Sequence, residues 1–136
     1  MIELLIVIGI IGVLAAVVLV SLSGARSSAR DTKRVSDIRQ IISALQLYYS
    51  DNGGYPLPAT PTTTGPDASS GDPDWSTYLP SWPNAPATQD GSCTALENPY
   101  TYTQVASGAD FTLSFCLGKA VSSITAGPHT ATSAGF

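Results

Sequence analysis

Few residues in this chain of 136 residues have the types and spacing that chemistry requires. The single histidine, His129, has no cysteine or carboxylate patterned beside it, so we interpret it as a surface residue. The sequence contains no G-x-S-x-G motif, no phosphate-binding glycine loop and no haem-attachment motif. We therefore predict no catalytic residue, no enzymatic activity and no cofactor.

The two cysteines, Cys93 and Cys116, are the clearest candidates for covalent chemistry. A pair of cysteines in an exported chain is typical of one disulfide, and their spacing matches no zinc motif. We predict a disulfide between them, with a metal-binding or redox-active pair as the alternative. Closing that loop stabilises the fold by roughly 3 kcal/mol.

Glu3 is another candidate for a chemical role, because it lies at the N-terminal end of an apolar segment. No side chain from Leu4 to Val20 is polar, and the next charge after Glu3 is Arg26. A helix over that gap is about 30 Å long, which is the thickness of a bilayer core. An ionisable group at the centre of such a helix costs roughly 2.5–3.5 kcal/mol and usually marks function.

Small residues inside the apolar segment indicate how it packs. Gly12 and Ala16 form a small-xxx-small pair, and Gly9 precedes them. Small residues let helix backbones approach closely in an apolar medium. We predict helix–helix packing at Gly9, Gly12 and Ala16; plain contact between helix and lipid is the alternative.

The helix is predicted to continue to about residue 51. Apolar side chains recur at spacings of three and four and form one face, which Ile41 and Tyr48 widen: Val35, Ile38, Ile42, Leu45 and Tyr49. The other side carries the charged residues Arg30, Lys33, Arg34, Asp37 and Arg39. Lys33 and Asp37 have the i,i+4 spacing of an ion pair. Asn52-Gly53-Gly54 and Pro56 end the helix.

The remaining residues predict a β-rich head. Residues 56–92 are rich in Pro, Thr, Ser and Gly, and four apolar residues are expected to anchor this loop, with a short helix or turn at about 75–79: Trp75, Tyr78, Leu79 and Trp82. Period-two alternation over 100–105 and 111–117 predicts a β-hairpin with its aromatic face toward the helix. Two weaker strand candidates follow, Ala120–Thr125 and His129–Ser133, split by Gly127-Pro128. Cys116 falls on the outer face, so the disulfide would tie the loop over the outside of the sheet.

The predicted fold class is α+β, with a long N-terminal helix and a small antiparallel sheet packed on its second half. We divide the chain into an apolar half of the helix (1–25), an amphipathic half (26–52) and a head (53–136). The length suits one domain plus an anchor.

The two halves of the chain differ in charge. Residues 1–50 hold five of the six basic residues, whereas 51–136 hold only Lys119 against seven acids. An acidic head is a poor binder of nucleic acid or of an anionic membrane. The five basic residues after the apolar run favour a cytoplasmic head by the positive-inside rule, whereas the cysteine pair and the Thr/Pro-rich composition favour export.

The N-terminal residues I-E-L-L-I-V-I-x-I-I-G-x-L-A-A resemble the signature of mature type IV pilins and the related pseudopilins. The match is dense over about the first 20 residues; the helix ending in DNGGYP and the head with its cysteine pair extend it more loosely. The resemblance implies a filament subunit, held first in the inner membrane and later in a bundle of N-terminal helices. It implies that Glu3 neutralises the N-terminal amine of a neighbouring subunit.

Two features of the family precede the Ile-Glu pair: an N-methylated Phe and a short basic leader. Met1 stands where a Leu is usual, so we expect the sequence to be truncated or to start at an internal Met. The basic leader would compete with the positive charges after the apolar run, and we therefore favour export of the head.

Our leading hypothesis is a type IV pilin that forms a homo-oligomeric cell-surface filament for adhesion, twitching motility or DNA uptake. Its partners would be the prepilin peptidase and the pilus assembly machinery. The cysteine pair and the long Thr/Pro loop favour this hypothesis. The close alternative is a pseudopilin of a type II secretion system, because DNGGYP and Asn98-Pro99-Tyr100 resemble the head of the major pseudopilin. A membrane-anchored binding module is a third hypothesis, from a different class.

Calcium is the one ion that the resemblance suggests, because major pseudopilins bind it in a loop of the head. Four aspartates are concentrated in the loop of this chain: Asp67, Asp72, Asp74 and Asp90. Their spacing matches no EF-hand. We favour a solvated acidic loop over a calcium site.

Overall fold

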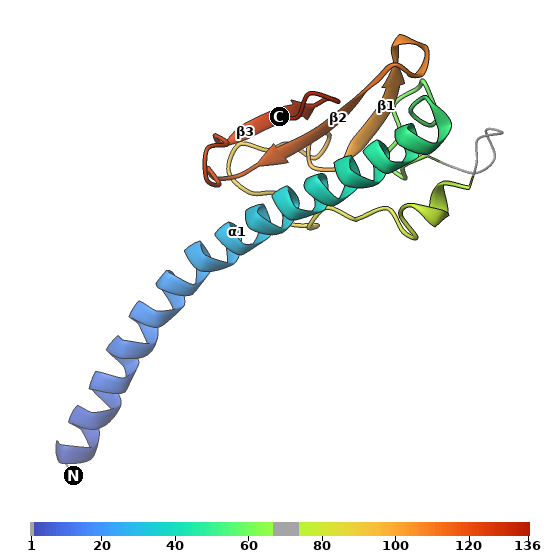
Figure 1. The fold of residues 1–136 in the computed structure, drawn as a ribbon. Coiled ribbons are helices and arrows are strands. Elements are labelled where there is room, and N and C mark those ends of the chain that lie inside the picture. Colours follow the sequence, from blue (N-terminus) through green and yellow to red (C-terminus); the bar gives the residue numbers. More distant parts are fainter. Residues whose placement is uncertain (1, 67–73) are drawn as a thin grey trace.

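A computed structural model describes residues 2–66 and 74–136, with the backbone alone at 19–21. Helix α1 (Ile2–Asn52) is followed by a three-stranded sheet of β1 (Thr101–Val105), β2 (Asp110–Leu117) and β3 (Gly127–Ala131). The first half of α1 projects freely, and its second half lies along the sheet (Figure 1). The fold is α+β, as predicted.

Helix α1 is continuous because no proline interrupts it before Pro56. It ends where the sequence predicts. Gly53 takes a positive φ of 73°, and its N–H donates to the carbonyl of Tyr49 at 2.8 Å. That left-handed conformation favours glycine and closes the last turn of the helix.

The core lies between the second half of α1 and the inner face of the sheet. The helix contributes the predicted stripe together with Ala44, and the sheet contributes the alternate residues of its strands; fully buried members include Ile38, Ile41, Leu45, Tyr102, Phe111, Leu113 and Leu117. The prediction for Tyr49 is wrong. Tyr49 is 40% exposed, and its ring packs on Tyr55 at 4.7 Å between centroids.

The predicted hairpin is confirmed, with β1 antiparallel to β2 and Tyr102 opposite Leu113. The third strand differs from the prediction. Residues 120–125 form a tight turn closed by hydrogen bonds between Val121 and Ile124, and strand β3 begins at Gly127. Pro128 is tolerated within β3 because this strand lies at the edge of the sheet, where a residue without an N–H can face away from the ladder.

The predicted anchors pin the loop to the core. A 3₁₀ turn spans Trp75–Thr77, and the side chain of Asp74 caps it by accepting from the Ser76 N–H at 3.0 Å. Trp75 and Leu79 are buried, while Tyr78 and Trp82 are partly buried against the core. Residues 75–82 of the loop are therefore packed against the head.

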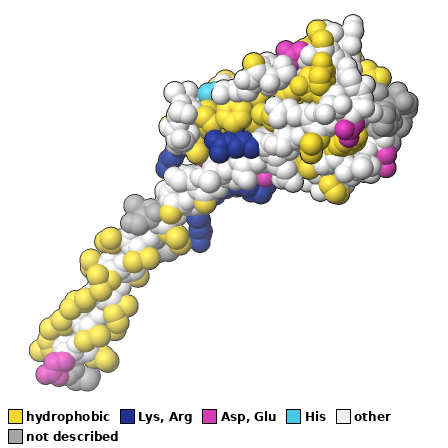
Figure 2. Space-filling model, in the orientation of Figure 1, with side chains coloured by type: hydrophobic (Ala, Val, Ile, Leu, Met, Phe, Trp, Pro, Cys, Tyr) yellow, Lys and Arg dark blue, Asp and Glu magenta, His cyan; other side chains and the backbone are white. Residues whose placement is uncertain are grey.

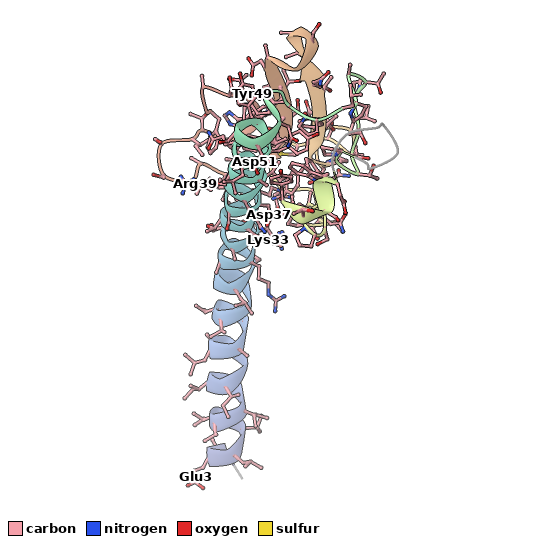
Figure 3. All side chains as sticks on the ribbon, turned by 45° about the vertical axis from the view of Figure 1, so that its right-hand side comes forward. Glu3, Lys33, Asp37, Arg39, Tyr49 and Asp51 are labelled. Atoms are coloured by element: carbon pink, nitrogen blue, oxygen red, sulfur yellow. A yellow bond between two sulfur atoms is a disulfide. The ribbon has the colours of Figure 1, made fainter. Side chains whose placement is uncertain are left out.

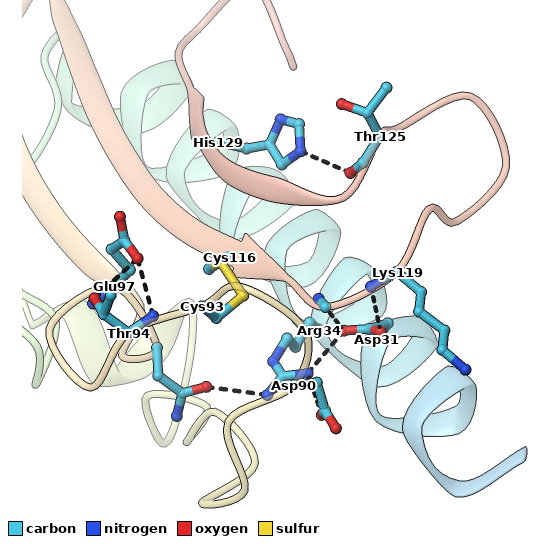
Figure 4. Close-up of a disulfide and its surroundings, with 12 residues drawn as sticks. Asp31, Arg34, Asp90, Cys93, Thr94, Glu97, Cys116, Lys119, Thr125 and His129 are labelled. Carbon is cyan, nitrogen blue, oxygen red and sulfur yellow. Dashed lines mark hydrogen bonds and ion pairs between the residues drawn. A yellow bond between two sulfur atoms is a disulfide. The ribbon is translucent and has the colours of Figure 1, made fainter. Parts of the chain in front are cut away.

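Cys93 and Cys116 form the predicted disulfide, with an S–S distance of 2.02 Å (Figure 4). Cys116 follows Phe115 on β2 and is fully buried beneath the loop that carries Cys93. Beside the bridge, Gly91 has a φ of 59°, and a Cβ there would lie 2.3 Å from the carbonyl oxygen of Gly118. Loop and strand backbones thus touch at this point.

Removing the disulfide tests how much the link between the loop and β2 contributes to stability. We expect the double substitution Cys93→Ala and Cys116→Ala to lower the free energy of unfolding by about 3 kcal/mol, because the unfolded chain regains the entropy of an open loop. Urea unfolding of the full chain in a neutral detergent measures the difference. Reduction of the native chain should give a similar loss, and an unchanged free energy would contradict the expectation.

Candidate functional site

The free half of α1 exposes a long series of apolar side chains. Every large apolar side chain from Ile2 to Val18 is more than half exposed. Figure 2 shows this apolar surface running along nearly the whole free half. A helix that is apolar all round is normally buried, so another molecule must cover it. By length and composition α1 is long and apolar enough to cross a membrane, with a mean hydropathy of 3.1 in its most apolar window.

The predicted assembly residues lie on this free half. Glu3 is at the far tip of the helix, remote from the labelled charges of the second half (Figure 3). No described residue forms a hydrogen bond or ion pair with it. A Cβ placed on Gly9 or Gly12 would meet no atom within 4 Å. The structure therefore places Glu3, Gly9, Gly12 and Ala16 on one exposed segment, and their roles stay predictions.

A buried charged cluster joins the helix to the head, and sequence reasoning missed it. Arg34 was expected to face solvent, yet Arg34 and Asp31 are both fully buried. Nη1 of Arg34 donates to Asp31 at 2.8 Å and to Asp90 at 3.0 Å. Its Nη2 donates to the carbonyl of Thr88 at 2.9 Å and to the side chain of Asn98 at 3.0 Å. One guanidinium thus ties the helix to the loop.

Asp31 connects the same cluster to the sheet. Its carboxylate accepts from the backbone N–H of Gly118 at 3.0 Å and of Lys119 at 2.9 Å, just after the end of β2. Figure 4 shows Asp31, Arg34 and Asp90 beside the disulfide. Helix, loop and sheet therefore meet at one junction.

Asp90 is the second buried carboxylate of the junction. Arg30 donates to it through Nε at 2.8 Å and through Nη2, and Arg34 adds a third bond. These bonds, with that of Arg30 the strongest cause, lower the pKa of Asp90 to about 2 although burial opposes the shift. Asp90 is therefore a partner of arginines and not a free oxygen ligand.

This placement bears on the calcium alternative. Asp74 caps the 3₁₀ turn and Asp90 binds arginines, while Asp67 and Asp72 lie outside the described residues. Within residues 2–66 and 74–136, no group of three or more potential ligand residues is brought together.

A second polar contact lies one turn further along α1. The hydroxyl of Tyr100 donates to Asp37 at 2.9 Å, and Lys33 forms the predicted i,i+4 ion pair with the same carboxylate. Burial, and then the hydrogen bond to Asp37, raise the pKa of Tyr100 well above its usual value. Asp37 was expected on the solvent side, but it is 9% exposed.

The ion pairs change how much free positive charge follows the apolar run. Arg30, Lys33 and Arg34 all have carboxylate partners in the folded chain. Among the described residues, Arg26 and Arg39 are the basic residues after the apolar run that have none. In the folded chain, the positive charge that follows the apolar run is thus largely neutralised.

The sequence did carry a signal for the junction. Asp31 and Arg34 precede Val35 and Ile38 at the same three- and four-residue spacing as the apolar stripe. Extending that stripe one turn toward the N-terminus predicts that both side chains point at the head.

Comparison with known proteins finds relatives of one segment of the chain. A segment of 56 residues, 41% of this chain, aligns with these relatives. In that segment the chain is 45% identical to the type II secretion system core protein G of Pectobacterium carotovorum subsp. carotovorum and of Escherichia coli (strain K12). It is 41% identical to that of Aeromonas hydrophila. The match spans only 36–39% of the length of these relatives. No family model and no solved structure matches the chain.

These similarities support the pilin and pseudopilin family, and they do not favour the type IV pilins within it. The relatives are named for a core protein of a secretion system and for no enzymatic activity. The names of these relatives agree with the expectation that this chain has no enzymatic activity.

Replacing Arg34 tests the junction. We expect Arg34→Met to lower the free energy of unfolding by about 3–5 kcal/mol, because Asp31 and Asp90 would keep buried charges without their shared cation. Chemical unfolding of the full chain in neutral detergent measures the loss. Arg39→Met is the matched control: Arg39 is exposed, so we expect a change within about 0.5 kcal/mol. Equal losses in the two variants would contradict a special role for Arg34.

The lowered pKa of Asp90 predicts acid sensitivity. Its stabilisation is fully present above the unfolded pKa near 4, and is lost as the pH falls through about 2, because the folded state must then bind a proton. We expect at most about 2 kcal/mol to be lost between pH 4 and pH 2.

Unfolding free energies measured across that window, for the native chain and two variants, check this expectation. Asp90→Asn should have a shallower slope, since it lacks the titrating group. Arg30→Gln should lose stability at higher pH, since the strongest cause of the lowered pKa is gone. A slope that neither substitution changes would assign the acid sensitivity to other carboxylates.

Proposed function

We propose that this chain is a subunit of a helical filament, specifically a pseudopilin of a type II secretion system. The exposed apolar half of α1 supports a filament subunit most directly. The similarity to relatives named type II secretion system core protein G favours the pseudopilin over the type IV pilin of our leading sequence hypothesis. The work of such a subunit is assembly rather than catalysis.

The physical argument concerns what can cover the apolar half. Fully burying one large apolar side chain stabilises a protein by about 1.5–3 kcal/mol, and this half exposes a continuous series of them from Ile2 to Val18. The head lies beyond this segment and packs only on the second half of α1. Two coverings suit a helix that is apolar all round: a bilayer before assembly, and the helices of other copies afterwards.

Glu3 supplies the specificity of that second covering. An unpaired carboxylate among apolar helices is far more costly than a paired one, so it favours the arrangement that gives it a cation. In line with the resemblance to the family, we assign that cation to the N-terminal amine of a neighbouring copy. Gly9, Gly12 and Ala16 would let the backbones approach closely enough for such pairing.

The same proposal defines location and partners. The chain would wait in the inner membrane, be processed by a prepilin peptidase, and enter a periplasmic filament through the assembly machinery. The disulfide is consistent with an exported head, since such bonds persist in oxidising compartments.

A type IV pilus remains the second candidate. The disulfide ties the loop over the outer face of the sheet, which suits a head exposed on a surface filament. The two functions differ in where the filaments are found. Long fibres sheared from cells and made mainly of this chain would favour the pilus, whereas short filaments confined to the periplasm would favour the pseudopilin.

Glu3→Gln is the direct test of the assembly role. We expect filament yield to fall at least about tenfold, the effect of losing roughly 1.4 kcal/mol per subunit contact, while the chain stays in the membrane fraction. Quantitative blots of membrane and filament fractions, with electron microscopy, measure both. Glu97→Gln makes the same chemical change in the head, where Glu97 accepts from Thr94, and should assemble normally. Normal yield from Glu3→Gln would refute the role of Glu3.

A further inference from the structure

Some basic residues near the base of the head have acidic partners and others do not. Arg30 and Arg34 are balanced by Asp31 and Asp90 at the junction. Two other cations, Arg26 and Lys119, lie at the base of the head, and both are exposed. We call them the basic pair; neither has an acidic partner among the described residues. Figure 2 shows basic side chains where the helix enters the head.

Lys119 is held in place at its backbone and extends toward the free half of the helix. Its N–H donates to Asp31 at 2.9 Å, so the residue is anchored to α1. Its Nζ lies 3.9 Å from the position that a Cβ on Gly24 would occupy. Figure 4 shows the side chain extending from the head beside the helix. Lys119, the single basic residue of the head, therefore lies beside the helix at the end of its apolar half.

Arg26 reaches the same level from the helix itself. Side chains of an α-helix tilt toward its N-terminus, so the guanidinium extends back toward the apolar half. At about 100° per residue, Arg26 and Gly24 lie on nearly opposite sides of α1. The basic pair therefore flanks the helix on two sides, with one cation on each.

The height of the basic pair matches the headgroup layer of a bilayer. The apolar run ends at Val20. At about 1.5 Å per residue, Gly24 lies about 6 Å and the Cα of Arg26 about 9 Å beyond it. The headgroup region on each side of a bilayer is about 5–7 Å thick. Leu4–Val20 is about 25 Å long, near the lower limit for a spanning helix. With these residues alone in the hydrocarbon core, both cationic groups fall at the level of the lipid phosphates.

We propose that the basic pair binds the headgroups of anionic phospholipids while the chain resides in the membrane, one lipid at each cation. The inference rests on the proposed function only for the membrane-spanning state of α1. It differs from the sequence-based expectation that an acidic head binds anionic membranes poorly. Four acids of the head make their hydrogen bonds with residues other than the basic pair: Asp51, Asp74, Glu97 and Asp110. A lysine or arginine near an anionic membrane strengthens binding by about fivefold.

Lipid binding to the full chain in neutral detergent tests the proposal. The probes are phosphatidylglycerol and phosphatidylcholine, titrated separately, with native mass spectrometry to count the lipids bound to each chain. We expect two tightly bound phosphatidylglycerol molecules and a clear preference over phosphatidylcholine. Arg26→Gln and Lys119→Gln should each lose one of the two, with about fivefold weaker binding at that position. Raising the salt to about 1 M should weaken the preference.

Two controls separate specific contact from net charge. Arg39→Gln removes one exposed cation further along α1 and should keep both bound lipids. Arg26→Lys keeps the charge and should restore binding. Equal binding of the two lipids, or an equal loss in Arg39→Gln, would overturn the proposal. Filament yield is measured independently, so a chain that prefers phosphatidylglycerol but forms no filament would contradict the proposed function and leave the lipid contact standing.

Discussion

The buried guanidinium of Arg34 is the interaction on which the arrangement of this molecule depends. A cation without exposure is tolerated only when its charge is paired. Nη1 and Nη2 of Arg34 have acceptors, whereas its buried Nε has none among the described residues. Here the pairing comes from two segments far apart in sequence: Asp31 on the helix, and Asp90 with the carbonyl of Thr88 on the loop. The planar fork of arginine suits this role, since it directs several donors at once in defined directions. The head can therefore dock on α1 in one register only.

The covalent and electrostatic constraints meet at the same place. The disulfide joins the loop to β2 close to the point where Asp31 binds the backbone after β2. The disulfide lowers the entropic cost of the ion pairs. A loop that the disulfide has already closed loses less conformational entropy when Asp90 binds the arginines. The stiffness of this junction sets the direction in which the apolar half leaves the head. For a subunit that packs through that half, the direction decides where its head lies in a filament.

The sequence predicted well what depends on local periodicity. The helix, its end at Gly53 and the β1–β2 hairpin follow from spacing and turn residues, and the disulfide follows from an even count of cysteines. Three features depend on tertiary context and were missed. Arg34 is buried because the head supplies its partners, and Tyr49 is exposed because the stripe turns away at the end of the helix. Pro128 enters β3 because, within residues 2–66 and 74–136, no further strand pairs with that edge. The sequence predictions placed charged residues in solvent and proline outside strands, as is usual for these residue types. The tertiary contacts of this fold produce exceptions to both.

The basic residues after the apolar run show how tertiary structure changes the free charge that a sequence count indicates. The positive-inside rule counts basic residues near the end of a membrane helix. In the folded state Arg30, Lys33 and Arg34 are paired with carboxylates, so they no longer act as three free cations. Those carboxylates come partly from the helix and partly from the head, and the head can supply its share only after it has folded. The folded chain therefore carries less unpaired positive charge after the apolar run than the sequence alone indicates. An acidic head serves this arrangement directly, since Asp90 neutralises part of the base of the helix and, among the described residues, leaves Arg26, Arg39 and Lys119 without an acidic partner.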